Sequence, residues 1–79
     1  MATKNDLVDW LYEALRGLGR GRIPYLCKFV WENHEQELRQ SGELFYTWQY
    51  DIRWAAYQLR KSNKMKQQAL SPKGIWELA

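Results

Sequence analysis

The chain has 79 residues, 46% of them hydrophobic and 15% aromatic. This length holds one small core, so we expect residues 1–79 to form one domain, with residues 1–5 flexible. The composition excludes a disordered chain, and the single Cys excludes a disulfide framework. No run of about 20 apolar residues is present to span a bilayer. The first residues lack the apolar core of a signal peptide, so we expect a cytoplasmic protein with no membrane contact.

The net charge of +3 lies entirely in the second half of the chain. Residues 1–39 carry six Lys or Arg and six Asp or Glu, which makes that half neutral. The segment 52–76 holds six cations and no carboxylate: Arg53, Arg60, Lys61, Lys64, Lys66 and Lys73. A local excess of cations favours a polyanionic partner.

The first helix is predicted from about Asp6 to Leu18, with Asn5 or Asp6 as its N-cap. Its apolar residues recur at spacings of three and four, which indicates one buried face. Gly19 ends it, because glycine tolerates the left-handed conformation that often follows a helix. A basic connector, residues 19–22, leads to the second helix.

The second helix is predicted from about Pro24 to Arg39, since proline suits a first helical turn. Its expected buried stripe is Ile23, Cys27, Val30 and Trp31, with Leu38 as a later anchor. We interpret Cys27 as a reduced core residue and His34 as a surface residue.

The third helix is predicted from about Thr47, its cap, to Ser62. Its apolar residues share one face: Trp48, Ile52, Ala55, Ala56 and Leu59. A strand over residues 64–67, a type I turn over 71–74 and a return strand over 74–78 follow. Residues 21–23 can add a third strand. This order predicts an α+β, mostly α fold of the winged helix-turn-helix class, with three helices and a C-terminal β-hairpin wing.

The outward face of the third helix is the predicted contact with double-stranded DNA. In the major groove, Arg can donate two hydrogen bonds to guanine, and Gln can donate one to adenine and accept one from it, while other cations bind phosphates. The expected DNA-binding residues are Gln49, Tyr50, Arg53, Tyr57, Arg60, Lys61, Lys64 and Lys73, and Arg20 and Arg22 are candidate phosphate contacts. The alternative is a solvated helix face. We expect Trp54 to pack under the wing or against a neighbouring helix.

Catalytic and metal-binding patterns are missing from the sequence. The segment 34–38 begins like a zinc-protease helix, but Leu38 stands where the second His is required. The chain contains neither a phosphate-binding Gly-rich loop of the Walker type nor the Glu-x-Lys or Asp-x-Lys pattern of metal-dependent nucleases. We therefore expect no enzyme activity, no metal and no cofactor.

Residues 45–61 and 71–78 resemble the N-terminal winged-helix domain of Mrr-type restriction proteins. The resemblance is carried by Trp54, Ala55 and Leu59 in the helix and by Pro72-Lys73-Gly74 before the last strand. In that family the domain is thought to recognise DNA, and a separate carboxy-terminal domain cleaves it. The resemblance therefore implies a stand-alone DNA reader without the nuclease domain.

Two functions follow from these observations. The first is a bacterial DNA-binding protein, either a transcriptional regulator or the recognition subunit of a restriction or defence system. The alternative is a protein–protein adaptor on a winged-helix scaffold. Its hot spot would be Tyr50, Trp54 and Tyr57, because aromatic residues dominate such interfaces. A protein partner or a homodimer is compatible with both.

Overall fold

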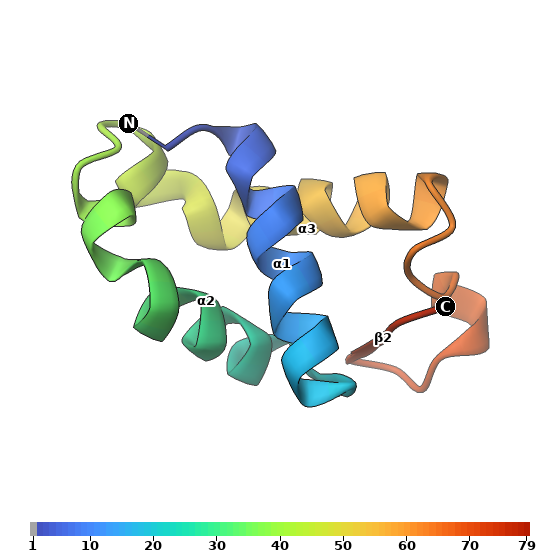
Figure 1. Ribbon diagram of the computed structural model, residues 1–79. Coiled ribbons are helices and arrows are strands. Elements are labelled where there is room, and N and C mark those ends of the chain that lie inside the picture. The colour runs from blue at the N-terminus through green and yellow to red at the C-terminus, as the bar shows by residue number, and fades with distance from the viewer. Residues whose placement is uncertain (1) are drawn as a thin grey trace.

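Three helices and two short strands make up the computed structural model, which describes residues 2–79. The helices are α1 (Lys4–Leu18), α2 (Ile23–Arg39) and α3 (Leu44–Lys61), and the strands are β1 (Arg20–Arg22) and β2 (Ile75–Glu77). In Figure 1, α1 crosses in front of α3, α2 lies to the left, and β2 lies to the right of the C-terminal end of α1. The predicted class, mostly helical α+β with three helices, is confirmed.

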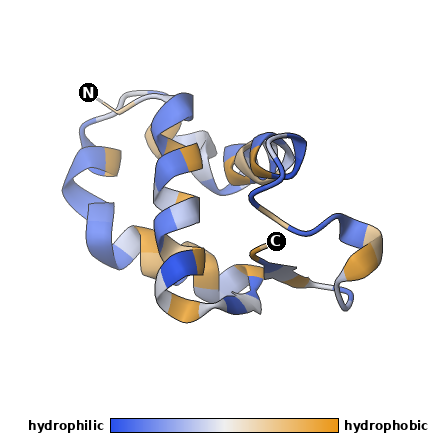
Figure 2. Ribbon diagram, turned by 45° about the vertical axis from the view of Figure 1, so that its right-hand side comes forward, coloured by the Kyte–Doolittle hydropathy of each residue, from blue (hydrophilic) through white to orange (hydrophobic). Residues whose placement is uncertain are grey.

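The core lies between the apolar faces of α1 and α3, and α2 closes one side. In Figure 2, hydrophobic and hydrophilic stretches alternate along the helices, as expected of helices with one buried face. The predicted inner face of α3 is confirmed, and small residues on it allow α1 to approach closely. The buried residues of α3 are Leu44, Trp48, Ile52, Ala55, Ala56 and Leu59, and those of α1 are Leu7, Leu11, Ala14 and Leu15.

The N-cap of α1 is Thr3, whose backbone N–H donates to the Asp6 carboxylate at 2.8 Å. The helix therefore begins two residues earlier than predicted. Lys4 and Asn5, which we expected in a flexible end, are helical; the same expectation for Met1 falls outside the described residues. The predicted end at Gly19 is confirmed, since this residue has a φ of 80° and its N–H donates to the Leu15 carbonyl.

The buried face of α2 differs by about one residue from the prediction. Pro24 lies in the first turn, as expected. Val30 is fully buried, but Leu26 takes the inner position that we assigned to Cys27, which is only half-buried. Leu26 packs beside β1, where a Cβ placed at Gly21 would lie 3.6 Å from its side chain. Cys27 consequently faces the side of α3 rather than the centre of the core.

α2 bends at His34, where φ is −135° and ψ is 24°. The imidazole stacks on Trp10 of α1 with ring centroids 4.1 Å apart, and its Nδ1 lies 2.9 Å from Oε2 of Glu37. Its other nitrogen lies 3.4 Å from a carboxylate oxygen of Glu13. The hydrogen bond with His34 lowers the pKa of Glu37. The predicted surface histidine is thus only partly exposed, because Trp10 covers one face of the ring.

α3 begins at Leu44, three residues before the predicted start. Leu44 is buried, so the hydrophobic face of the helix extends one turn further towards its N-terminus than we assigned. Thr47 is not a cap; its hydroxyl lies 2.7 Å from a carboxylate oxygen of Asp51 on the next turn.

The small sheet joins β1 and β2 as antiparallel neighbours, with Arg20 opposite Glu77 and Arg22 opposite Ile75. The segment that we expected only as an added third strand is thus the main partner of the last strand. β1 reaches the C-terminal strand because α1 and α2 are joined directly through it.

The predicted C-terminal hairpin wing is not formed as expected. The segment after α3 meets the end of the chain through one isolated bridge, Met65 to Leu78, which the Lys66 N–H flanks by donating to the Glu77 carbonyl at 2.9 Å. Beyond this bridge, the carbonyl of Lys66 accepts a hydrogen bond from Nε of Arg60 at 3.2 Å. The chain then enters a 3-10 turn, η1 (Gln68–Leu70), and returns as a loop.

The turn before β2 starts one residue later than predicted. The N–H of Ile75 donates to the Pro72 carbonyl at 3.1 Å, so Pro72 is the first residue of the turn. Gly74, the third residue, has a φ of 78°, which fits a type II turn rather than type I. Lys73 lies at its tip.

Candidate nucleic-acid interface

The face of α3 opposite the core is exposed, in agreement with the predicted rotation of this helix. Tyr50 is 79% exposed and Tyr57 58%, while Ile52 on the inner face is fully buried. Arg53 is exposed beside them. Trp54 is half-buried, and the ammonium of Lys4 in α1 lies 4.5 Å from its ring centroid, so it packs at a helix as expected.

The cations of the described chain fall into two groups. Those of the first group have a carboxylate or an aromatic ring as partner; Arg20 and Lys66, for example, both contact Glu77, at 3.1 and 3.0 Å. These two hydrogen bonds lower the pKa of Glu77. Those of the second group have neither partner among residues 2–79: Arg22, Lys28, Arg53, Lys61 and Lys73.

Arg53 lies where several members of this second group meet. It lines one hollow together with Lys28 of α2, a second together with Lys73, and a third together with Arg22 and Gly74. The start of α2 is tied to the turn by a backbone hydrogen bond from Ile23 to Gly74, 3.4 Å long. The fold thus gathers free cations from α2, α3, β1 and the turn around one arginine.

The second of these hollows, which we call the cationic hollow, lies between α3 and the loop that precedes β2. It has a volume of about 230 Å³ and is lined by Arg53, Arg60 and Lys73, with no carboxylate in its wall. Arg60 is held in place by its hydrogen bond to the loop and by the ring of Trp76, 5.9 Å from its guanidinium. Partial burial lowers the pKa of Arg60. Three cations without a counter-charge make this hollow suited to an anion such as a phosphate.

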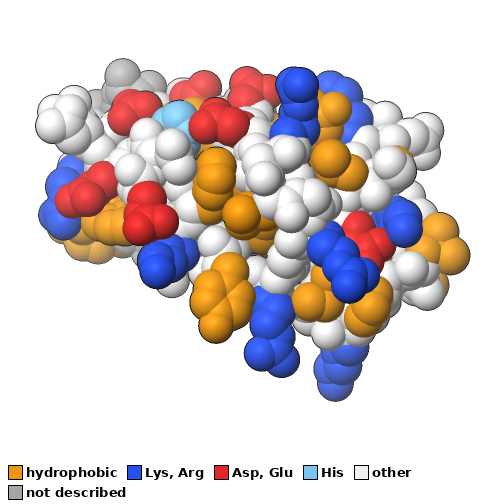
Figure 3. All heavy atoms as spheres, turned by 60° about the horizontal axis from the view of Figure 1, so that its bottom comes forward, with side chains coloured by type: hydrophobic (Ala, Val, Ile, Leu, Met, Phe, Trp, Pro, Cys, Tyr) orange, Lys and Arg blue, Asp and Glu red, His pale blue; other side chains and the backbone are white. Residues whose placement is uncertain are grey.

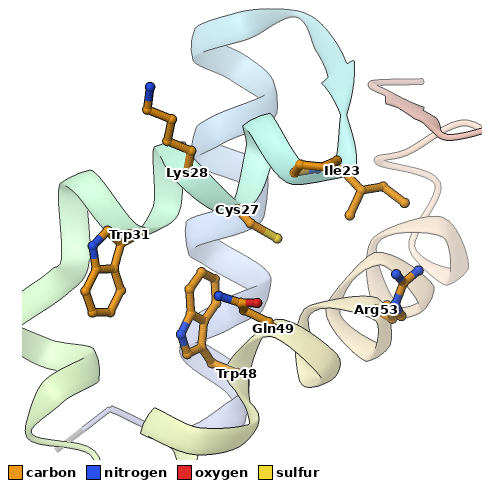
Figure 4. Close-up of a pocket in the computed structure, with 8 residues that line it drawn as sticks. Ile23, Cys27, Lys28, Trp31, Trp48, Gln49 and Arg53 are labelled. Atoms are coloured by element: carbon orange, nitrogen blue, oxygen red, sulfur yellow. The ribbon is translucent and has the colours of Figure 1, made fainter.

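The first hollow, which we call the apolar hollow, lies between α2 and α3 and has a volume of about 460 Å³. Figure 4 shows Cys27 pointing from α2 towards Gln49 of α3, with Arg53 rising beside Ile23. Two parallel indoles, Trp31 and Trp48, line its wall with centroids 6.2 Å apart. Burial raises the pKa of the Cys27 thiol, and the nearby positive charge of Arg53 offsets this in part.

The predicted DNA-binding residues do not all lie together. Gln49, Arg53, Arg60 and Lys73 line the two hollows, and Tyr50 and Tyr57 are exposed on α3. Lys61 is exposed at the end of α3, away from both hollows. Lys64 lies instead against α1, with its ammonium 5.2 Å from the ring of Tyr12.

Sequence reasoning missed Lys28 and assigned equal roles to two arginines that differ. Arg20 is paired with Glu77, whereas Arg22 is free. The strand register decides this, because it places the carboxylate opposite Arg20 and Ile75 opposite Arg22. Lys28 stands one turn after Pro24 on α2 and lines the same hollow, a place that no pattern in the sequence indicated.

On one face of the molecule, acidic and basic side chains lie mostly apart. Figure 3 shows carboxylates gathered on the half of one face that carries the histidine, and most Lys and Arg side chains on the other half. Among residues 2–79, no group of three or more His, Cys, Asp or Glu could hold a metal ion. None of the helices described is long and apolar enough to cross a bilayer.

No family model, curated protein or solved structure matches this chain.

Proposed function

We propose that the chain is a winged-helix protein that binds double-stranded DNA and has no enzyme activity of its own. The order of elements supports this class, since a strand between the first two helices pairs with the strand that follows the third helix. The loop of residues 66–74 takes the place of a regular wing. The resemblance of residues 45–61 and 71–78 to the N-terminal domain of Mrr-type restriction proteins points the same way.

The observation that carries the proposal is the gathering of unpaired cations around Arg53. A surface that binds phosphates needs cations that no carboxylate neutralises, because each phosphate bound releases counterions and adds affinity. This requirement is met by Arg22, Lys28 and Lys73. Each of the three lines a hollow that Arg53 also lines.

In this proposal α3 enters the major groove. Arg53 and Gln49 are exposed on the side of α3 that faces α2 and the turn, within reach of base edges. Arg22 and Lys73 flank them on β1 and the turn, where they bind backbone phosphates and orient the helix. Such a DNA-binding domain would suit either a transcriptional regulator or the recognition subunit of a restriction or defence system.

A protein–protein adaptor is the second candidate, favoured by the exposed tyrosines of α3. Tyr46 is 84% exposed and Tyr50 79%, and such side chains often anchor protein partners. We rank it second because a protein hot spot does not account for free cations on four different elements.

The test is the salt dependence of binding to a fluorescent duplex of about 20 base pairs, measured by anisotropy. With about four phosphates neutralised, the logarithm of the affinity should fall with the logarithm of salt concentration at a slope of roughly −4. Lys73→Ala should flatten this slope by about 1. Lys64→Ala is the matched control, since its ammonium lies on α1, and should leave the slope nearly unchanged. Folded protein that fails to bind at low salt would overturn the proposal.

A further inference from the structure

The two hollows that meet at Arg53 differ in chemistry. The apolar hollow is lined by Trp31, Trp48 and Cys27, and it also carries the amide of Gln49 and the ammonium of Lys28. The cationic hollow presents Arg53, Arg60 and Lys73 and no carboxylate. Arg53 lines both. A ligand that spans them therefore needs an apolar part with a polar edge, next to an anion.

The phosphates of a continuous duplex would contact only the cations of this site and would leave the apolar hollow empty. The apolar hollow has a volume of about 460 Å³, within the range of about 300–1,000 Å³ typical of small-molecule sites. A paired base cannot enter it, because both its faces are stacked in the duplex and its edge is hydrogen-bonded. An unpaired base offers a flat apolar ring and a free hydrogen-bonding edge, and proteins that hold such bases use aromatic side chains together with cations.

We propose that the apolar hollow receives one unpaired nucleobase and that the cationic hollow binds the neighbouring phosphate. The domain then prefers DNA with an unpaired nucleotide, such as a bulge or a frayed end, over continuous duplex. This inference rests on the proposed DNA-binding function and names the form of DNA that the site selects. Gln49 donates to or accepts from the base edge, and Arg53 lies between base and phosphate.

The experiment compares three DNAs of the same sequence. The first is a continuous duplex, the second carries one extra unpaired thymidine, and the third carries an abasic nucleotide at the same bulge. The second and third have the same phosphates and differ only in the base. We expect the thymidine bulge to bind about ten-fold more tightly than the abasic bulge, because stacking and edge contacts of one base are of this order.

The reactivity of the Cys27 thiol shows whether the apolar hollow is occupied. It is the only cysteine of the chain, so its rate of alkylation by iodoacetamide at mildly alkaline pH is easily measured. The thymidine bulge should slow this reaction, whereas the abasic bulge and the continuous duplex should have little effect.

Two variants separate the base site from the rest of the interface. Cys27→Phe fills the hollow and should abolish the preference for the thymidine bulge while binding of continuous duplex persists. Gln49→Ala changes an exposed side chain without risk to the core and should reduce the same preference. Because Gln49 also faces base edges in the proposed duplex complex, the quantity to compare for this variant is the ratio of its affinities for the thymidine and abasic bulges.

Equal affinity for the thymidine and abasic bulges, with equal Cys27 alkylation, would overturn the base site and leave duplex binding intact. Failure to bind any of the three DNAs would overturn the proposed function itself. Protection of Cys27 by an acidic peptide with a leucine anchor, but not by the thymidine bulge, would assign the hollow to a protein partner and also overturn the proposal.

Discussion

The two ends of the small sheet differ in whether their cations are paired with a carboxylate. At the paired end, which consists of Arg20, Lys66 and Glu77, one largely buried carboxylate side chain holds two cations at 3.1 and 3.0 Å. At the free end, which consists of Arg22, Arg53 and Lys73, no carboxylate is in contact with any of the three within the described chain. The two ends are separated by only the length of a three-residue strand.

This difference separates cations that are paired within the fold from cations that, in the proposed function, bind DNA phosphates. The paired end joins β1, the segment after α3 and β2 through one carboxylate. The free end gains nothing from its like charges, which repel one another until an anion neutralises them. The comparison therefore predicts that substitutions at the free end change binding, and that those at the paired end change stability.

The largest effect is expected for loss of two cations at the free end. Arg53→Ala with Lys73→Ala should weaken DNA binding by about 1–3 kcal/mol for a lost base contact, and further for the lost phosphate contact. The matched control, Lys64→Ala with Lys66→Ala, removes the same charge elsewhere. Anisotropy titrations of both double variants measure the difference. Equal losses would mean that only the total charge matters.

The turn that carries Lys73 offers a second, smaller test. Gly74→Ala places a side chain at a φ of 78°, which should cost about 1 kcal/mol of unfolding free energy and weaken DNA binding through the displaced turn. Gly21→Ala is the control, because its φ is ordinary and its new methyl would meet Leu26 only at 3.6 Å. Urea denaturation distinguishes them. If both variants lose the same stability, the turn is not strained as we describe.

The smallest effect is expected at the paired end, since its two cations are substantially exposed and such ion pairs contribute little. The folded-state pKa of Glu77 is lowered, so its contribution is present above the unfolded value of about 4.3 and is lost as pH falls through the folded value. Glu77→Gln should therefore lower Tm at neutral pH, and the difference from the parent should vanish in acid. A difference that is constant from pH 7 to pH 3 would contradict this.

The helices were largely predictable from the sequence. The inner face of α3 and the end of α1 at Gly19 follow from local periodicity and from glycine, which act within a few residues. The position of Leu26 and the packing of His34 on Trp10 were not predictable in this way. Both depend on segments that are distant in the chain, β1 and α1, and on how these pack against α2.

The pairing of the strands was likewise not predictable from local sequence patterns. The basic, apolar and turn residues after α3 indicated a hairpin, yet the strand pairs with β1, about 55 residues earlier in the chain. The hydrogen bond from Arg60 to the carbonyl of Lys66, in the segment expected to form the first wing strand, is likewise a contact that no spacing rule anticipates. The candidate site follows from this pairing, because the register frees Arg22 and neutralises Arg20.

The most direct test of the account compares Arg20→Ala with Arg22→Ala. Both remove one arginine from the same strand, so the net charge changes equally. We predict that Arg22→Ala weakens binding to duplex DNA several-fold and flattens the salt slope by about 1, while Arg20→Ala leaves both near the parent values. Equal affinities for the two variants, or a larger loss in Arg20→Ala, would contradict the claim that unpaired cations around Arg53 form the DNA-binding site.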